Sequence, residues 1–129
     1  MDERRKVPRK QTDHFFGIYH RKTDEFIGKL LDLSRKGMMI SALRSMDAKT
    51  IYEIRIIFPL PIEGKYTLTF DAECVWCCES TSSDKNYKAG FHFTDIYLDE
   101  LETIEYLLNN ALFHDEEEQP RLTLAKKST

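Results

Sequence analysis

Apolar and polar residues alternate along much of the chain between residues 12 and 94, as they do in half-buried β-strands. The clearest alternation lies in residues 67–79, where one face consists of Leu68, Phe70, Ala72, Cys74, Trp76 and Cys78. Further strands are predicted at residues 12–20, 26–33, 38–41, 51–58 and 87–94. The pattern therefore predicts about six strands, each with one buried face.

Connections are predicted where polar residues, prolines and glycines interrupt these runs. We expect a polar turn at residues 21–25 and a loop at residues 42–50. Residues 59–64 include two prolines and a glycine, so we expect them to end the strand before them. Residues 32–37 are expected to form a turn, because Asp and Ser can bond to nearby backbone and Gly can take a positive φ.

After residue 94 the apolar residues recur every three or four positions instead of every two, which predicts one helix. This stripe consists of Leu98, Leu101, Ile104, Leu108, Ala111 and Leu112. Asp99 and Glu102 resemble the capped start of a helix, and residues 115–120 are expected to end it. Short strands, short connections and one terminal helix predict a small antiparallel barrel or sandwich, with the helix over an open edge or mouth.

The composition fits a single globular domain, with 129 residues, 41% hydrophobic and 32% charged. No apolar run approaches the roughly 20 residues that a membrane helix needs, so we expect no membrane insertion. The charged N-terminus lacks the apolar stretch of a secretion signal, and the compartment is expected to be cytoplasmic.

The chain offers no recognisable catalytic or metal-binding motif. Its histidines are scattered, no nucleophile stands near a base, and no glycine-rich phosphate loop is present. Cys74 and Cys77 have metal-ligand spacing, but in a regular strand they would point to opposite faces, unless a β-bulge intervened. We therefore expect reduced, buried thiols, no cofactor and no enzymatic activity, and we place Trp76 in the core.

The first ten residues carry five cationic side chains against two acidic ones, whereas the whole chain sums to −3. Pro8 disfavours a helix, so this segment is expected to be an extended or turning arm. Arginine forks onto phosphate oxygens and stacks on planar bases, which suits such an arm to a phosphorylated ligand. The simpler alternative is a solvated basic terminus.

The arm and the turn at residues 32–37 together resemble the two-part signature of PilZ domains, which are bacterial receptors for cyclic di-GMP. The first part is Arg5-x-x-x-Arg9, and the second is Asp32-x-Ser34-x-x-Gly37. The resemblance covers roughly residues 3–114, including residues 90–93 and the helix after them. It implies an all-β fold with one C-terminal helix, namely a six-stranded antiparallel β-barrel preceded by a flexible basic arm.

The resemblance also implies a role for each signature residue. Arg5 and Arg9 would grip phosphate and stack on or hydrogen-bond guanine, and Asp32 would accept hydrogen bonds from guanine N1 and N2. Ser34 would add a smaller polar contact, and Gly37 would leave room for the ligand.

Two further residues are open to a ligand role. Arg4 precedes the signature, as in relatives that take up two stacked ligand molecules. Trp76 lies on a strand from which some relatives supply an aromatic wall, although its alternation here favours the core.

We thus expect a flexible arm at residues 1–10, a barrel with its helix at residues 11–114 and an acidic, polar tail at residues 115–129. The expected function is that of a non-enzymatic receptor that binds cyclic di-GMP and relays it to an unidentified effector protein by ordering the arm. One alternative is a ligand-independent adaptor with the same fold. Another is a barrel that binds single-stranded nucleic acid, which the pI of about 5.8 and the inward aromatics disfavour, so no nucleic-acid partner is expected.

Overall fold

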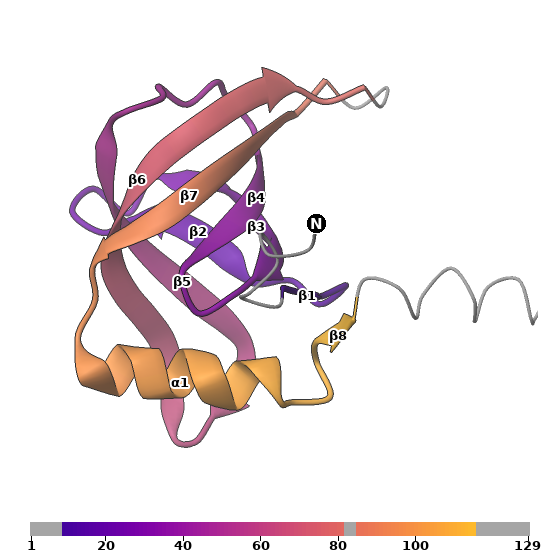
Figure 1. Cartoon of the computed structure of the whole chain (residues 1–129), viewed down its shortest axis with the longest axis vertical. Helices are drawn as coiled ribbons and strands as arrows, with labels where there is room; N and C mark the ends of the chain where they lie inside the picture. Colours follow the sequence, from indigo (N-terminus) through magenta and orange to yellow (C-terminus); the bar gives the residue numbers. More distant parts are fainter. Residues whose placement is uncertain (1–8, 82–84, 116–129) are drawn as a thin grey trace, which may run out of the picture.

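The computed structural model describes residues 9–81 and 85–115, which form a sheet that curls into a barrel and a helix across one end (Figure 1). Every strand pairing is antiparallel. In chain order the elements are β1 (Lys10–Gln11), β2 (Gly17–His20), β3 (Phe26–Leu33), β4 (Gly37–Ala42), β5 (Ile51–Ile62), β6 (Lys65–Glu79), β7 (Tyr87–Asp95), α1 (Leu98–Leu108) and β8 (His114–Asp115).

Six of these strands form the barrel, in the order β2-β5-β6-β7-β4-β3, and the pairing of β2 with β3 closes it. Closure pairs strand edges that would otherwise be exposed. The predicted six-stranded antiparallel barrel with a C-terminal helix is therefore confirmed. The strand expected at residues 12–20 is shorter, because β2 begins only at Gly17.

The two-residue strands β1 and β8 extend the sheet beyond β3, and no feature of the sequence predicted them. Lys10 pairs with Leu33 of β3 on one side and with Asp115 of β8 on the other. The Lys10 Nζ also lies 3.1 Å from the Asp115 Oδ1. Lys10, expected as the last residue of the arm, is thus paired with Asp115, expected as the first residue of the tail.

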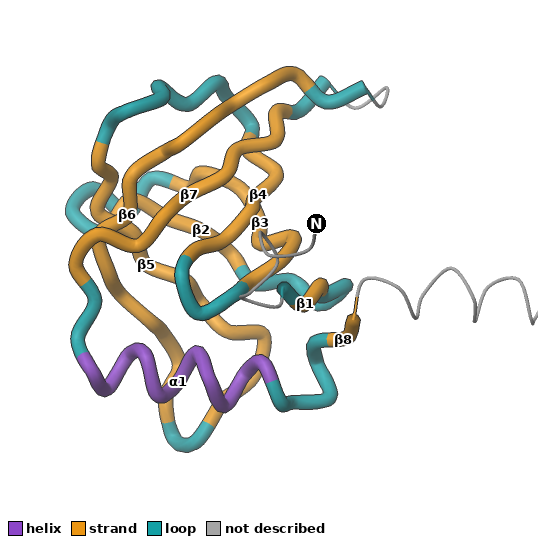
Figure 2. The backbone as a smooth tube through the Cα atoms, in the orientation of Figure 1, coloured by secondary structure: helices purple, strands orange, loops and turns teal. Residues whose placement is uncertain are grey.

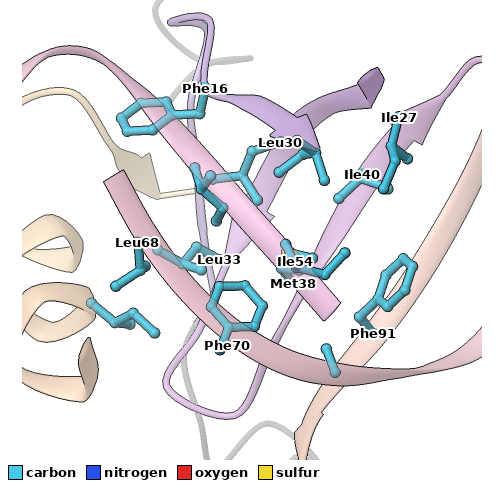
Figure 3. Close-up of a cluster of buried hydrophobic side chains, with 14 of the residues drawn as sticks. Phe16, Ile27, Leu30, Leu33, Met38, Ile40, Ile54, Leu68, Phe70 and Phe91 are labelled. Carbon is cyan, nitrogen blue, oxygen red and sulfur yellow. The ribbon is translucent and has the colours of Figure 1, made fainter. Parts of the chain in front are cut away.

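The interior of the barrel is filled by apolar side chains from every long strand. Figure 3 shows Phe16, Leu30 and Ile54 inside the ring of strands, and each is at most 1% exposed. Full burial of such a side chain stabilises the fold by roughly 1.5–3 kcal/mol. The alternating apolar residues of β5 and β7 face this core, as their period-two pattern predicted.

The strand β5 continues through Pro59 and Pro61 to Ile62, so the expected break at residue 59 is wrong. The strand β2 pairs with β5 only as far as Ile57, and beyond this point the outer edge of β5 has no strand partner within the described residues. A proline there removes no ladder hydrogen bond. The chain reverses at residues 63–64, where both φ angles are positive, 51° and 78°.

A β-bulge in β6 reverses its alternation after Cys74. Cys74 lies opposite Phe91 and Trp76 opposite Gly90, so residue 75 is an extra residue on the β6 side. Beyond the bulge Cys77 packs against the core, whereas Trp76 and Cys78 are exposed. The prediction that Trp76 and Cys78 share the buried face was therefore wrong.

The helix α1 lies across one end of the barrel and buries Thr103, Ile104 and Leu107. Its stripe differs from the predicted one, because Leu98 is 70% exposed. Its N-cap is Tyr97, without a side-chain cap bond, so the expected capped start was also wrong. Within the described ranges, no helix is long and apolar enough to span a membrane.

The helix ends at Leu108, earlier than expected, and the chain then turns back towards β1 (Figure 2). Phe113 is 5% exposed, and its ring centroid lies 5.2 Å from that of Phe16 in the core. The Thr12 hydroxyl donates to the Leu112 carbonyl at 2.7 Å. A continued helix would lose these contacts, which explains the early end.

We predict that Leu107→Ala lowers the free energy of unfolding by about 2–5 kcal/mol, because it leaves a cavity between α1 and the barrel. The matched change Leu98→Ala, in the same helix but at an exposed position, should alter it by less than about 0.5 kcal/mol. Urea unfolding followed by circular dichroism measures both values. Equal losses in the two variants would contradict the packing described for α1.

Candidate functional site

The root of the basic arm is fixed beside the turn that carries the second signature segment. In the register of β1 and β3, Lys10 lies opposite Leu33 and Gln11 opposite Asp32. Arg9 directly precedes β1 and Ser34 directly follows β3, so both lie at the same end of this pairing. The pairing therefore joins two segments that are distant in the sequence, whereas Arg4 and Arg5 lie outside the described residues.

A cavity of about 210 Å³ opens at this junction, and its lining includes Arg9, Asp32, Ser34 and Gly37. The structure thus brings together all four of the predicted site residues that it describes. The other lining residues come from the turn, β4, β6 and β7, and apart from Trp76, whose ligand role was left open, they were not considered for the site: Lys36, Met38, Met39, Val75, Trp76, Gly90, Phe91 and His92.

Asp32 supplies a carboxylate at the inner wall of the cavity, since its residue is only 3% exposed. It lies on β3, a strand held by β1 on one side and β4 on the other. A carboxylate is an acceptor-only group when ionised, so it can bind a ligand that presents two neighbouring N–H donors. The edge of a guanine base has this donor pattern.

Ser34 is engaged in closing the turn between β3 and β4. Its Oγ accepts hydrogen bonds from the amides of Lys36 and Gly37, both at 3.1 Å, and donates to the Gly37 carbonyl at 3.3 Å. The Ser34 amide also donates to that carbonyl, at 2.9 Å. These hydrogen bonds stabilise the turn, as serine side chains often do by bonding to nearby backbone groups.

Gly37 is required by strand packing and not by a left-handed backbone. A Cβ built on it would lie 2.0 Å from the carbonyl oxygen of Phe91 on β7. Gly64 is the only glycine with positive φ in the described part of the chain, so the expected positive φ at Gly37 was wrong. A larger residue here would push β4 away from β7 and open the cavity wall.

Trp76 forms one side of the cavity, with its ring over the backbone of Gly90. A Cβ built on Gly90 would lie 2.3 Å from the Trp76 Nε1. The residue is 40% exposed, so an indole face is available to a ligand. The bulge at Val75 is what turns Trp76 outwards, and strict alternation along β6 could not reveal it.

The charged groups around the cavity are mostly cationic. Arg9 and Lys36 are exposed, and the exposed imidazole of His92 lies on the same lining. Arg35 is not part of it, because its guanidinium lies 3.5 Å from Glu105 of α1. Two cations, a buried carboxylate and an aromatic face suit a ligand that combines phosphate with a planar base.

The cysteines form no metal site that the described residues could complete, since no group of three potential ligands is present among them. The bulge does direct Cys77 inwards like Cys74, so the expectation that they point apart was wrong. Burial raises the pKa of the Cys74 thiol to about 11, and the nearby Cys77 adds to the rise. The Met46 amide donates to the Cys77 sulfur at 3.3 Å.

Comparison with known proteins identifies the fold and its family. The sequence profile described as PilZ domain matches residues 3–110. No curated protein sequence gives a significant match. The structure is similar to the PilZ domain of YcgR from Escherichia coli, solved with c-di-GMP, at TM-score 0.64 and 14% identity, covering 98% of this chain and 99% of that one.

Two longer proteins contain a similar fold. The K. pneumonia MrkH complex with c-di-GMP gives TM-score 0.68 and 18% identity, over 98% of this chain and 56% of that one. The Bacillus subtilis inhibitor of motility MotI/DgrA gives 0.63 and 15%, over 84% of this chain and 54% of that one. The chain thus spans little more than half of these two proteins, and at such identities the likeness concerns the fold alone.

We predict that Gly90→Ala displaces the indole of Trp76, because the new methyl group would occupy the position of the ring. Trp76 is the only tryptophan, so its fluorescence reports the change directly. The emission maximum should move to longer wavelength, and iodide should quench it more strongly. Thr94→Ala, at an exposed position on the same strand, serves as the control, and an unchanged spectrum in Gly90→Ala would refute the placement of the ring.

We also predict that iodoacetamide at pH 8 modifies the exposed Cys78 at least about tenfold faster than Cys74, whose thiol is covered and stays protonated. Mass spectrometry of peptides taken at successive times measures the two rates. In urea the difference should disappear, because unfolding exposes both thiols. Comparable rates in the native protein would contradict the burial of Cys74.

Proposed function

The chain belongs to the PilZ domain family, and from this premise we propose that it is a non-enzymatic receptor for cyclic di-GMP. The observation that carries the proposal is the cavity beside β1, which joins Arg9 at the root of the arm to Asp32 on the barrel wall. YcgR and MrkH, whose folds are similar, were solved with this ligand.

The ligand has two phosphodiester charges and two guanines, and the cavity offers a group for each kind of feature. Arg9 binds a phosphate and stacks on a base, while Asp32 accepts from guanine N1 and N2. Trp76 offers its exposed indole face as a second stacking surface. Ser34 and Gly37 keep the turn and the strand spacing that hold these groups in place.

The relay to a partner acts through the arm in this proposal. Arg4 and Arg5 precede the point at which β1 fixes the chain, so a phosphate held by Arg9 lies within their reach. Their binding orders the arm over the barrel and creates a new face for an effector protein. Ordering costs about 1–2 kcal/mol per residue, which charge-assisted hydrogen bonds of about 1.5–3 kcal/mol each must exceed.

A ligand-independent adaptor is the second candidate, and one observation favours it. The hydrogen bonds of Ser34 and the packing of Gly37 account for both residues without any ligand. The second signature segment would then persist for structural reasons alone. Arg9 lines the cavity and has no such role in the turn or the strand packing, and this difference favours the receptor.

We predict that the wild-type chain binds cyclic di-GMP in calorimetry and that Arg5→Ala and Arg9→Ala each weaken binding at least about tenfold. Arg44→Ala is the matched control, because Arg44 is an arginine whose side chain is 85% exposed and which does not line the cavity. Two ligands per chain would support a contribution from Arg4.

The same titration separates the two candidates. Absence of binding at tens of micromolar ligand, or equal affinities in wild type, Arg5→Ala and Arg9→Ala, would reject the receptor. The adaptor would in that case be the function to pursue.

A further inference from the structure

His92 is an exposed residue on β7, and the signature of the family does not include it. It lines the same cavity as Arg9 and Asp32. Its cross-strand neighbour on β4 is Gly37, which has no side chain that could cover the imidazole. The amide of Phe93 donates to the Lys36 carbonyl at 2.9 Å, so the backbone after His92 is tied to the signature turn.

Charged residues lie on each segment around His92. Lys36 lies on the turn, Arg9 at the root of the arm, and Asp32 on β3. On the other side, Glu73 of β6 is the cross-strand neighbour of His92. An anion bound between the two cations therefore lies on the same lining as the imidazole, whereas Glu73 is not one of the lining residues.

We infer that His92 binds a phosphate of cyclic di-GMP as an imidazolium and makes the affinity rise as the pH falls. This inference rests on the proposed function and assigns it a further binding residue. Imidazole is the side chain whose charge ordinarily changes between pH 5 and pH 8, whereas arginine, lysine and a phosphodiester keep theirs. The charge-assisted N–H···O bond from His92 thus exists only when the ring is protonated.

Binding near neutral pH also takes a proton from the solvent. A phosphate beside an imidazole stabilises the charged form of the ring, so the proposed bond draws a proton onto His92 as the ligand binds. The only covalent change is the transfer of one proton from the buffer to the imidazole. The heat of binding consequently depends on the ionisation enthalpy of the buffer, and this dependence counts the protons taken up.

The test is calorimetry with cyclic di-GMP at pH 5.5 and pH 8.0. Wild type should bind roughly threefold to tenfold more tightly at the lower pH, the gain expected from one exposed charge pair. His92→Gln keeps a hydrogen-bonding group that cannot be protonated, so it should lose this ratio and the proton uptake. His92→Lys carries a fixed charge and should bind equally well at both pH values.

His14→Gln is the control, because His14 is also exposed but does not line the cavity. It should retain the wild-type ratio. If His92→Gln retains the ratio as well, or if wild type shows neither pH dependence nor proton uptake, the role of His92 is refuted while the receptor stands. If wild type fails to bind at both pH values, the receptor itself is refuted and this inference with it.

Discussion

The close approach of β4 to β7 is the constraint on which the candidate site depends. At Gly37 the two strands leave no room for a Cβ, since one would lie 2.0 Å from the Phe91 carbonyl. This contact holds the start of β4 against β7, directly after the turn from β3, and β4 in turn pairs with β3 at Asp32. On the neighbouring side of β7, Gly90 leaves the space that the Trp76 ring fills. Two glycines thus determine the width of the cavity and one of its walls.

The bulge in β6 links this site to the core. With the extra residue Val75, the strand can place Cys74 and Cys77 inside the barrel and still turn Trp76 outwards between them. In a regular strand Trp76 would lie on the same face as Cys74, so it could not form a wall of the cavity while Cys74 fills the core. A bulge costs one unpaired residue in the ladder and redirects a side chain, which is its common use beside functional sites.

Periodicity in the sequence predicted the six strands and the helix, and the resemblance implied that Arg9 and Asp32 belong to one site, as their places on one cavity lining allow. The sequence pattern did not predict the bulge, because Val75, Trp76 and Cys77 are all apolar and fit either register. β5 can continue through its prolines because β2 stops pairing with it before them. The helix α1 ends early because Phe113 packs in the core. These features are set by contacts distant in sequence, which no local pattern contains.

The two halves of the signature differ in what their residues can report about a ligand. Ser34 and Gly37 hold the turn and the strand spacing, so their replacement disturbs the cavity whether or not anything binds there. Neither Arg9 nor the imidazole of His92 takes part in the hydrogen bonds of Ser34 or in the packing of Gly37. The exposed indole of Trp76 packs over Gly90. A change at Arg9 or His92 that leaves the stability unaltered but alters affinity therefore reports contact with the ligand, and only such residues can separate a receptor from an adaptor that keeps the same turn.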